Sequence, residues 1–258
     1  MKVSIILPSN NKEKTEQFIK QFNSLRFFRG FVDIVIIGNG QFKESPKGLW
    51  NKDCFIKIDE DYTDKIIPFA KLRGLGMAYS SSDWFLFLDD DHFFEEKDKR
   101  EVEEILMKSL VFLDNHLDCG VLQLHKKSDK KSSFYIKKNA HIWTDRGLFI
   151  KRINFDYKKL SKLKGACEDL LYAYEVLNTG LLPYCLYNCK IKRGCNLPND
   201  YKENNNESYK EKLLDENIIG YIRKKYGQDN WGFYGNLKYL GYPNFLRQMI
   251  KKQLTNLI

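Results

Sequence analysis

The feature that most constrains this chain is a regular alternation of apolar runs and helical segments over residues 1–90. Four runs have the continuous hydrophobicity of strands buried on both faces: 3–8, 31–38, 54–59 and 84–88. A helix is expected after the first run, with one apolar face made by Phe18, Ile19, Phe22 and Leu25, and another over 68–82. This order predicts a parallel, three-layer α/β sheet.

The strand ends define where a ligand would bind. In parallel sheets, ligands sit beyond the carboxyl ends of the strands. Those ends are Pro8–Asn11, Gly38–Gly40, Asp59–Asp61 and Asp89–Asp91. We therefore expect these four turns to line one crevice. This places Asp89–Asp91, which we call the acidic turn, in a ligand-binding site.

Composition limits the other possibilities. With 258 residues, 43% of them hydrophobic, the chain suits one large α/β domain or a catalytic domain with a small appendage. Its first ten residues are a poor match to a signal peptide, and no window approaches the roughly 18 apolar residues of a membrane span. The six cysteines form no CxxC pair. We expect reduced thiols in a cytoplasmic protein, or in the host cytoplasm if the protein is viral.

The positive charge is concentrated in residues 126–164. This segment has 13 Lys or Arg against three Asp, a balance of +10 that accounts for the whole net charge of +9 of the chain. The aromatic residues interleaved with it are Phe134, Tyr135, Trp143, Phe149, Phe155 and Tyr157. The segment is either a solvated lysine-rich surface or a face that binds a polyanion and offers stacking groups.

Two carboxylate pairs are candidates for chemistry. Alternation in extended backbone would point Asp89 and Asp91 to one side, with Asp90 opposed. Two hard carboxylates suit Mg²⁺ or Mn²⁺. His92 is either a further ligand or, as we expect, an exposed loop histidine.

The second pair, Glu168 and Asp169, opens an amphipathic helix. Acidic residues favour helix N-termini for electrostatic reasons alone. A hydroxyl group, however, is a poor nucleophile, and a reaction at a hydroxyl needs a base such as a carboxylate within hydrogen-bond reach.

These stretches carry a family resemblance. "VSIILPSN", "AKLRGLGMAYSSSDW" and "LFLDDDHF" together resemble the donor half of inverting GT-A glycosyltransferases, most closely the large family-2-like group. The resemblance implies an α/β fold of the GT-A class, a Rossmann-like three-layer sandwich with a mostly parallel central sheet and a helical C-terminal extension. It also implies a catalytic domain over 1–190, with a donor half (1–95) and an acceptor half (96–190). A lid loop and packed helices would follow over 191–258.

The resemblance implies roles for individual residues. Asp89 and Asp91 would hold Mn²⁺ or Mg²⁺ on the diphosphate of a nucleotide sugar, most simply a UDP-sugar, and Asp169 would be the base, supported by Glu168. The donor would be bound by Pro8, Ser9, Asn10, Asn39, Lys71, Arg73 and Asp90. The acceptor would be bound by Trp143, Asp145, Arg146 and Lys151. In one departure from the family pattern, Asn39 stands between two glycines where an acidic, base-reading turn is usual; its amide can still hydrogen-bond a pyrimidine.

A second resemblance concerns the acceptor. Residues 168–196 and 200–235 are similar to glycosyltransferases that modify hydroxymethylated pyrimidines in DNA, the group associated with TET/JBP oxygenases. Shared features include the Glu-Asp helix and the Gly194–Asn196 turn, which reads Gly-Cys-Asn in place of Gly-Gly-Asn. The resemblance implies DNA as the acceptor, with the target base flipped out of the stack.

Several alternatives stay open. The acceptor could instead be a bacterial or viral surface saccharide or a lipid-linked glycan. Nucleotidyl transfer is disfavoured because residues 8–15 lack the glycine-rich loop that holds a triphosphate. A non-catalytic binding module is disfavoured because it would not need Asp89, Asp91 and Asp169. Residues 195–210 are a lid or a simple connector. The apolar stripe over 243–257 is expected to pack on the domain rather than on a membrane surface. No obligate protein partner is inferred.

Overall fold

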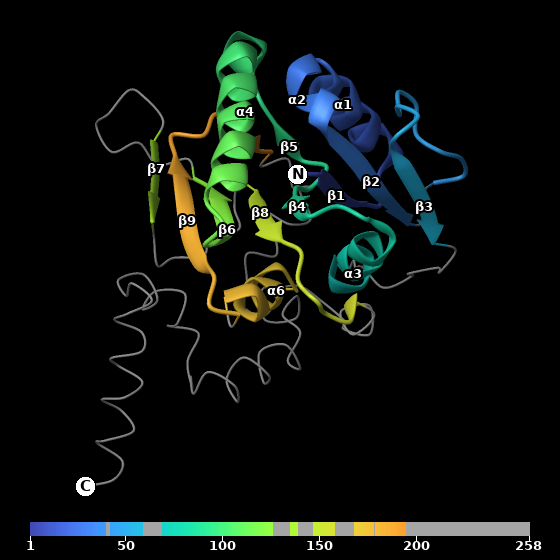
Figure 1. Ribbon diagram of the computed structural model, residues 1–258. Coiled ribbons are helices and arrows are strands. Elements are labelled where there is room, and N and C mark those ends of the chain that lie inside the picture. Colours follow the sequence, from blue (N-terminus) through green and yellow to red (C-terminus); the bar gives the residue numbers. More distant parts are fainter. Residues whose placement is uncertain are drawn as a thin grey trace, which may run out of the picture.

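The fold is built on one eight-stranded sheet (Figure 1). The computed structural model describes residues 1–39, 42–58, 69–125, 135–138, 147–157, 168–177 and 179–194. The strand order is β3-β2-β1-β4-β8-β6-β9-β7, and a separate ribbon pairs β10 with β5. The strands are β1 (Val3–Ser9), β2 (Val32–Asn39), β3 (Cys54–Ile58), β4 (Trp84–Phe87), β5 (His92–Phe93), β6 (Cys119–Leu124), β7 (Tyr135–Lys138), β8 (Leu148–Lys151), β9 (Leu182–Tyr187) and β10 (Lys192–Arg193).

The helices connect these strands as the alternation predicts. Asn11 caps the first helix, and its side-chain oxygen accepts a hydrogen bond from the backbone N–H of Lys14 at 3.0 Å. The helices are α1 (Lys12–Asn23), α2 (Arg26–Phe31), α3 (Phe69–Tyr79), α4 (Lys99–Asn115) and α6 (Glu168–Leu177), and a 3-10 turn covers Glu96–Asp98. The predicted strands and helices of the first 90 residues are confirmed, and β1, β2, β3 and β4 are mutually parallel.

Beyond β4 the sheet departs from a simple parallel order. β8 lies between β4 and β6 and is antiparallel to both, while β9 is parallel to β6. Gly147, directly before β8, has a φ of +115°, a conformation that L side chains rarely adopt. A Cβ there would also lie 2.7 Å from Leu88 Cδ2. Glycine at this position lets β8 start directly against the residue that precedes the acidic turn.

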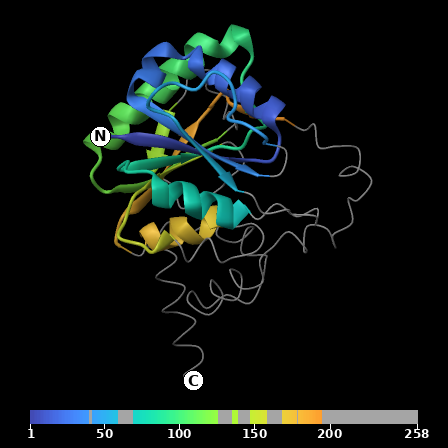
Figure 2. The same cartoon turned by 90° about the vertical axis from the view of Figure 1, so that its right-hand side faces the viewer.

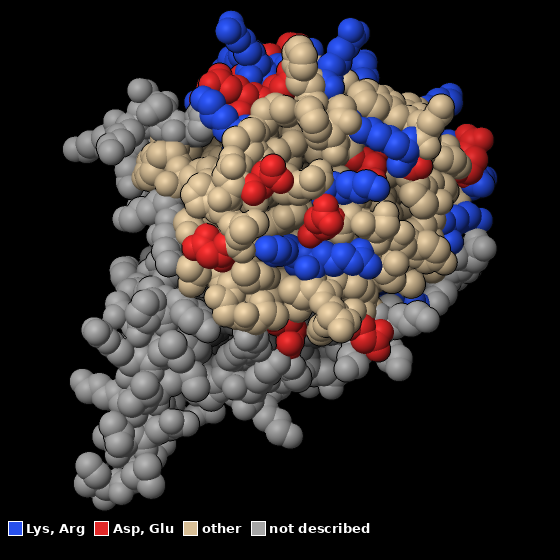
Figure 3. All heavy atoms as spheres, in the orientation of Figure 1, with Lys and Arg blue, Asp and Glu red and all other residues tan. Residues whose placement is uncertain are grey.

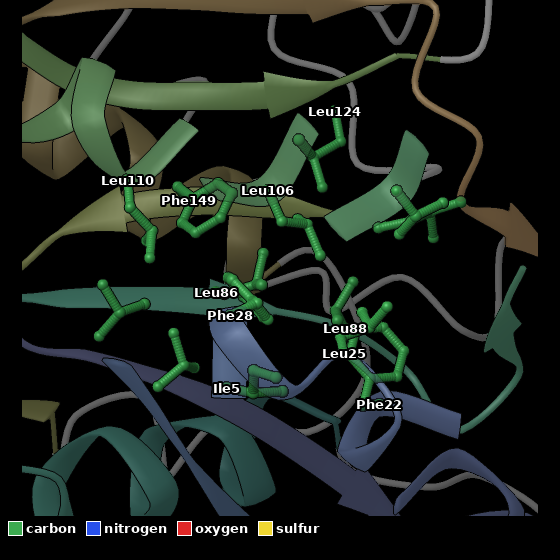
Figure 4. Close-up of a cluster of buried hydrophobic side chains, with 14 of the residues drawn as sticks. Ile5, Phe22, Leu25, Phe28, Leu86, Leu88, Leu106, Leu110, Leu124 and Phe149 are labelled. Atoms are coloured by element: carbon green, nitrogen blue, oxygen red, sulfur yellow. The ribbon is translucent and has the colours of Figure 1, made fainter. Parts of the chain in front are cut away.

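Helices cover both faces of the sheet (Figure 2). Helices α1, α2 and α4 lie on one face, and α3 and α6 lie side by side on the other. Two apolar cores fill the spaces between these layers. Figure 4 shows the first core, where β1 and β4 meet the helices through Ile5, Phe22, Leu25, Phe28, Leu86, Leu88, Leu106, Leu110, Leu124 and Phe149. Burying each such side chain contributes about 1.5–3 kcal/mol, so the strand ends are held by a well-packed body.

The surface of the described residues is of mixed charge on the face seen in Figure 3, where acidic and basic side chains are interspersed. Most of the basic segment 126–164 lies outside the described residues. No helix among the described residues is long and apolar enough to cross a bilayer.

Candidate functional site

The acidic turn lies where the central strands end. Because Ile6 pairs with Phe87 and Ser9 pairs with Gly38, the ends of β4, β1 and β2 meet at one edge of the sheet. We call this the carboxyl edge. Strand β4 ends at Phe87, and the chain then turns, with the N–H of His92 donating to the carbonyl of Asp89 at 3.0 Å. The expected meeting of these turns in one place is therefore confirmed for the ends of β1, β2 and β4, whereas Gly40 and Asp59–Asp61 lie outside the described residues.

Arg73 reaches the acidic turn from α3. Its Nη2 donates to Asp89 Oδ1, and both side chains are largely buried. The guanidinium carbon also lies 4.9 Å from the centre of the Phe87 ring. Arg73 therefore offsets one of the three adjacent carboxylates within the protein itself.

Asp90 points away from its two neighbours, toward β1. Its Oδ2 accepts a hydrogen bond from Ser9 Oγ, and Ser9 Oγ in turn accepts from Thr15 Oγ1 at 2.8 Å and from the backbone N–H of Asn11 at 3.0 Å. Burial raises the pKa of Asp90 to about 6, and the nearby charges of Asp89 and Asp91 act in the same direction, while the Ser9 hydrogen bond opposes the shift. Asp90 thus ties the acidic turn to the start of α1.

Asp89, Asp91 and His92 form the one group among the described residues whose ligand atoms could share a metal ion. One ligand atom from each lies within 4.8 Å of the other two. The expectation of an exposed His92 is wrong: only 3% of its surface is exposed. The backbone N–H of Asp89 donates to His92 Nδ1 at 2.8 Å, and the same nitrogen lies 3.2 Å from the carbonyl oxygen of Asp89. His92 therefore braces the turn through Nδ1, and the oxygen atoms of Asp89 and Asp91 are the better ligands.

Sheet topology determines where Asp169 lies along α6. Strands β6 and β9 run in the same direction as β4, and α6 directly precedes β9, so α6 runs back toward the strand starts. The end of α6 lies against the start of β6: a Cβ added to Gly120 would be 2.8 Å from Val176 Cγ1. The first turn of α6, with the half-buried Asp169, is therefore directed toward the carboxyl edge.

Tyr172 fixes this helix to the sheet. Its hydroxyl donates to the carbonyl of Lys151 and accepts from the backbone N–H of Ile153, both at 3.1 Å. The ring packs against Phe85 and Tyr157 in the second core. A buried tyrosine whose hydroxyl is satisfied in this way holds the orientation of the turn that carries Asp169.

Lys151 lies far from the acidic turn. Because β8 is antiparallel to β4, Lys151 pairs with Trp84, the first residue of β4. Its Nζ donates to the carbonyl of Leu117 at 3.3 Å. This placement, at the edge opposite the strand ends, removes Lys151 from the set of residues that we assign to the acceptor.

The other expected residues are placed as follows. Pro8, Ser9 and Asn39 are buried at the ends of β1 and β2, Asn10 is exposed just beyond β1, and Lys71 is half-buried on α3. The Oδ1 atom of Asn39 is buried and has no hydrogen-bond partner among the described residues. Trp143, Asp145, Arg146 and the side chain of Glu168 lie outside the described residues, as do the expected lid at 195–210 and the C-terminal stripe.

The sequence alone did not identify two residues that support the site at the carboxyl edge, Thr15 and Gly194. Thr15 supports Ser9, and its position one helical turn after the cap Asn11 was the signal available in the sequence. Gly194 contacts the acidic turn through a backbone hydrogen bond to Asp91. It was noted only as part of a turn motif, because its partner lies 103 positions earlier in the chain.

Comparison with known proteins supports this architecture. The sequence matches no known family profile and no curated protein. Among solved structures, the 1–349 fragment of S. aureus TarS matches with a TM-score of 0.50 at 15% identity, over 90% of this chain and 74% of that one. A longer S. aureus TarS structure gives 0.50 at 14% identity, over 78% of this chain and 38% of that one.

A third structure is the mannosyltransferase PcManGT of Pyrobaculum calidifontis, solved with GDP-mannose and Mn²⁺. It gives a TM-score of 0.49 at 11% identity, over 72% of this chain and 56% of that one. Identities this low compare folds alone, so the assignment rests on TarS and on the strand order. The chain is an α/β protein of the GT-A type, with its acidic turn at the carboxyl edge of the central sheet.

Proposed function

We propose that this protein is a metal-dependent inverting glycosyltransferase, which moves a sugar from a nucleotide-sugar donor, most simply a UDP-sugar, to an acceptor hydroxyl. The observation that carries the proposal is the cluster of Asp89, Asp91 and His92 at the end of β4 on a sheet of the GT-A type. Such clusters also occur on surfaces without function. Here the cluster lies where α/β sheets bind ligands.

The donor set fits a hard divalent cation. Asp89 and Asp91 offer carboxylate oxygens, which Mn²⁺ and Mg²⁺ prefer, and Arg73 already binds one oxygen of Asp89. Arg73 and His92 then act by orienting these two carboxylates. A bound cation would supply Lewis-acid stabilisation of the charge that develops on the diphosphate leaving group.

The donor nucleotide would lie along the ends of β1 and β2. The buried Oδ1 of Asn39 can accept a hydrogen bond from a base, and Pro8, Ser9 and Asn10 line the adjacent strand end. Lys71 and Arg73 extend from α3 on the same edge, where positive charge favours phosphate binding. Asp90 supports this region indirectly, by its bond to Ser9.

Asp169 is assigned as the general base. In the reaction, an acceptor hydroxyl oxygen attacks the anomeric carbon of the donor sugar from the side opposite the diphosphate. The new C–O bond forms as the bond to the diphosphate breaks, and the electron pair leaves with the diphosphate. The hydroxyl proton passes to the Asp169 carboxylate, with Glu168 as its neighbour in support. Single displacement in this geometry inverts the anomeric configuration.

The proposed acceptor is a hydroxymethylated pyrimidine in DNA. Support comes from the excess of +10 charge over residues 126–164, with its interleaved aromatics, and from the resemblance of residues 168–196 to DNA-base glycosyltransferases. Trp143, Asp145 and Arg146 belong to that segment and are assigned to the acceptor. A surface or lipid-linked glycan is the competing acceptor.

The test is a transfer assay on DNA that contains 5-hydroxymethylcytosine or 5-hydroxymethyluracil. The full chain is incubated with this DNA, Mn²⁺ and a mixture of nucleotide sugars, and the digested nucleosides are weighed by mass spectrometry. Asp169→Asn and Asp91→Asn are expected to lower turnover at least about 100-fold, because they remove the base and a metal ligand. Asp114→Asn, at an exposed position on α4, is the matched control and should retain activity.

Each outcome separates the parts of the proposal. A mass gain of one sugar, lost in Asp169→Asn, would support DNA as the acceptor. Metal-dependent hydrolysis of a nucleotide sugar without a mass gain would retain the transferase and favour a glycan acceptor. If no nucleotide sugar were consumed under any condition, the proposed activity would be wrong.

A further inference from the structure

The chain returns to the acidic turn after β9, in a two-stranded ribbon. Strand β10 pairs antiparallel with β5, so that Arg193 lies opposite His92 and Lys192 opposite Phe93. One residue later, the backbone N–H of Gly194 donates to the carbonyl of Asp91 at 2.7 Å. Residues about 100 positions apart therefore meet at one of the two proposed metal-binding aspartates.

Gly194 approaches Asp91 too closely for a side chain to fit easily. A Cβ at position 194 would lie 3.2 Å from the Asp91 carbonyl oxygen, 3.7 Å from Asp91 Cβ and 3.8 Å from Phe93 Cε1. The first of these distances is tighter than an ordinary van der Waals contact, so Asp91 would have to shift. The φ of Gly194 lies outside the left-handed region. Close approach to Asp91, and not an unusual backbone conformation, is therefore the reason for glycine here.

A second contact joins β10 to the segment that follows β5. Lys192 Nζ donates to Glu95 Oε1, two residues beyond β5. Glu95 Oε2 also accepts from Lys97 Nζ at 2.6 Å. An exposed ion pair contributes little by itself, but this one joins the two strands of a ribbon that has only two paired positions. It therefore helps to fix the distance between β10 and the acidic turn.

We propose that the β5–β10 ribbon is a positioning device for the metal-binding carboxylate of Asp91, with Gly194 as its contact residue and Lys192 as its second attachment. This inference rests on the metal site proposed above. The Asp91 side chain is attached to a backbone whose carbonyl is held by Gly194, so a shift of that carbonyl moves the ligand oxygens. Neighbours that orient a metal ligand typically account for 10- to 100-fold in affinity.

The test is a titration of the full chain with Mn²⁺, in which binding is measured as the decrease of the EPR signal of the free ion. The titration is done with Mn²⁺ alone and again in the presence of UDP or GDP. Gly194→Ala is expected to raise the Kd for Mn²⁺ by about threefold, and Gly194→Val, whose branched side chain displaces more, by roughly tenfold or more. Gly30→Ala is the matched control, because a Cβ at position 30 meets no atom within 4 Å. Its Kd should equal that of the wild type.

The Lys192 series tests the second attachment. Lys192→Met removes the charge and keeps most of the length, and should raise the Kd for Mn²⁺ by about two- to fivefold, as expected for loss of a partly exposed pair. Lys192→Arg keeps the charge and should restore the wild-type value. Thermal unfolding of each variant is followed in parallel, because a positioning role predicts weaker metal binding in variants whose Tm is close to that of the wild type.

The outcomes of these titrations distinguish a failure of this inference from a failure of the proposed function. If the wild type binds Mn²⁺ and Gly194→Val binds it equally well, the positioning role is wrong and the metal site stands. If the wild type binds no Mn²⁺, alone or with either nucleotide, the positioning role and the proposed metal site are both wrong. A Gly194→Val variant with unchanged Tm, weaker Mn²⁺ binding and an altered EPR spectrum of the bound ion would support the inference.

Discussion

Asp33 shows, at the scale of one residue, how strand burial acts on a charge. It lies on β2 opposite Ser4, and its Oδ1 atom has no hydrogen-bond partner among the described residues. Burial raises the pKa of Asp33 above its ordinary value of 3.8, and the charge of Asp53 acts in the same direction, while a hydrogen bond from Ser4 opposes it. We predict that Asp33→Asn, which has the same shape without the charge, raises the free energy of unfolding at pH 7.

The pH dependence of that gain follows from the sign of the shift. Since the folded-state pKa is raised, the carboxylate destabilises the fold when ionised, and this penalty disappears once Asp33 is protonated. The difference between Asp33→Asn and the wild type should therefore be largest above the folded-state pKa and vanish below about pH 3.8. Urea unfolding at several pH values measures it. A difference that did not change with pH would contradict the assigned cause.

At the scale of elements, a glycine on α3 and a glycine on α2 have opposite surroundings. A Cβ on Gly76 would lie 2.5 Å from Ile37 Cδ1 and 2.8 Å from Ile6 Cγ2, so α3 packs directly on β1 and β2. We predict that Gly76→Ala destabilises the protein by about 1–3 kcal/mol through overpacking, which outweighs the gain of up to about 1 kcal/mol in helix propensity. Gly30→Ala, in the open on α2, should have a neutral or stabilising effect. Chemical unfolding compares the two, and equal effects would contradict this account of α3.

A buried ion pair joins α2, β2 and the loop before β3. Arg29 Nη2 donates to both oxygens of Asp53, at 2.8 and 2.7 Å, and neither side chain is exposed. Asp53 also accepts backbone N–H bonds from Ile34 and Trp50, both at 2.8 Å. We predict that Asp53→Asn costs about 3–5 kcal/mol, because it leaves the Arg29 charge buried without its partner.

The control for that prediction is an exposed pair of the same chemistry. Glu104 and Lys108 lie 2.6 Å apart on the open face of α4, with about half of each side chain exposed. Glu104→Gln should change the free energy of unfolding by less than about 1 kcal/mol. If both variants unfolded at the same urea concentration as the wild type, the buried pair would not be stabilising.

For the whole molecule, the proposed site predicts a linkage between ligand binding and stability. A ligand that binds only the folded state stabilises it by about 2.7 kcal/mol at 100 times its Kd. We predict that Mn²⁺ with the correct nucleoside diphosphate raises Tm by several degrees, whereas the nucleotide with a chelator does not. The Tm of Asp91→Asn should not respond. Comparing UDP with GDP in this measurement identifies the base, and equal responses of wild type and Asp91→Asn would contradict the assigned ligands.

Local patterns in the sequence determined the parts of the fold whose contacts are local. Apolar runs predicted β1 to β4, and the helical stripe with Phe18 and Phe22 predicted α1, because burial imposes a period of two or 3.6 on neighbouring residues. The strand ends then gave the location of Asp89–Asp91, because parallel strands share one carboxyl edge. The Glu-Asp helix start was likewise readable, and α6 begins at Glu168.

Only the tertiary structure decided the contacts between distant parts of the chain. The antiparallel insertion of β8 put Lys151 at the start of β4, at the opposite edge from the acidic turn, and no local pattern distinguishes a strand of one direction from the other. The burial of His92 and the hydrogen bond of Gly194 to Asp91 depend on strand β10, which follows about 100 residues later in the chain and pairs with β5. Sequence periodicity reports which face of an element is buried, whereas the element that covers it is set by packing of the whole chain.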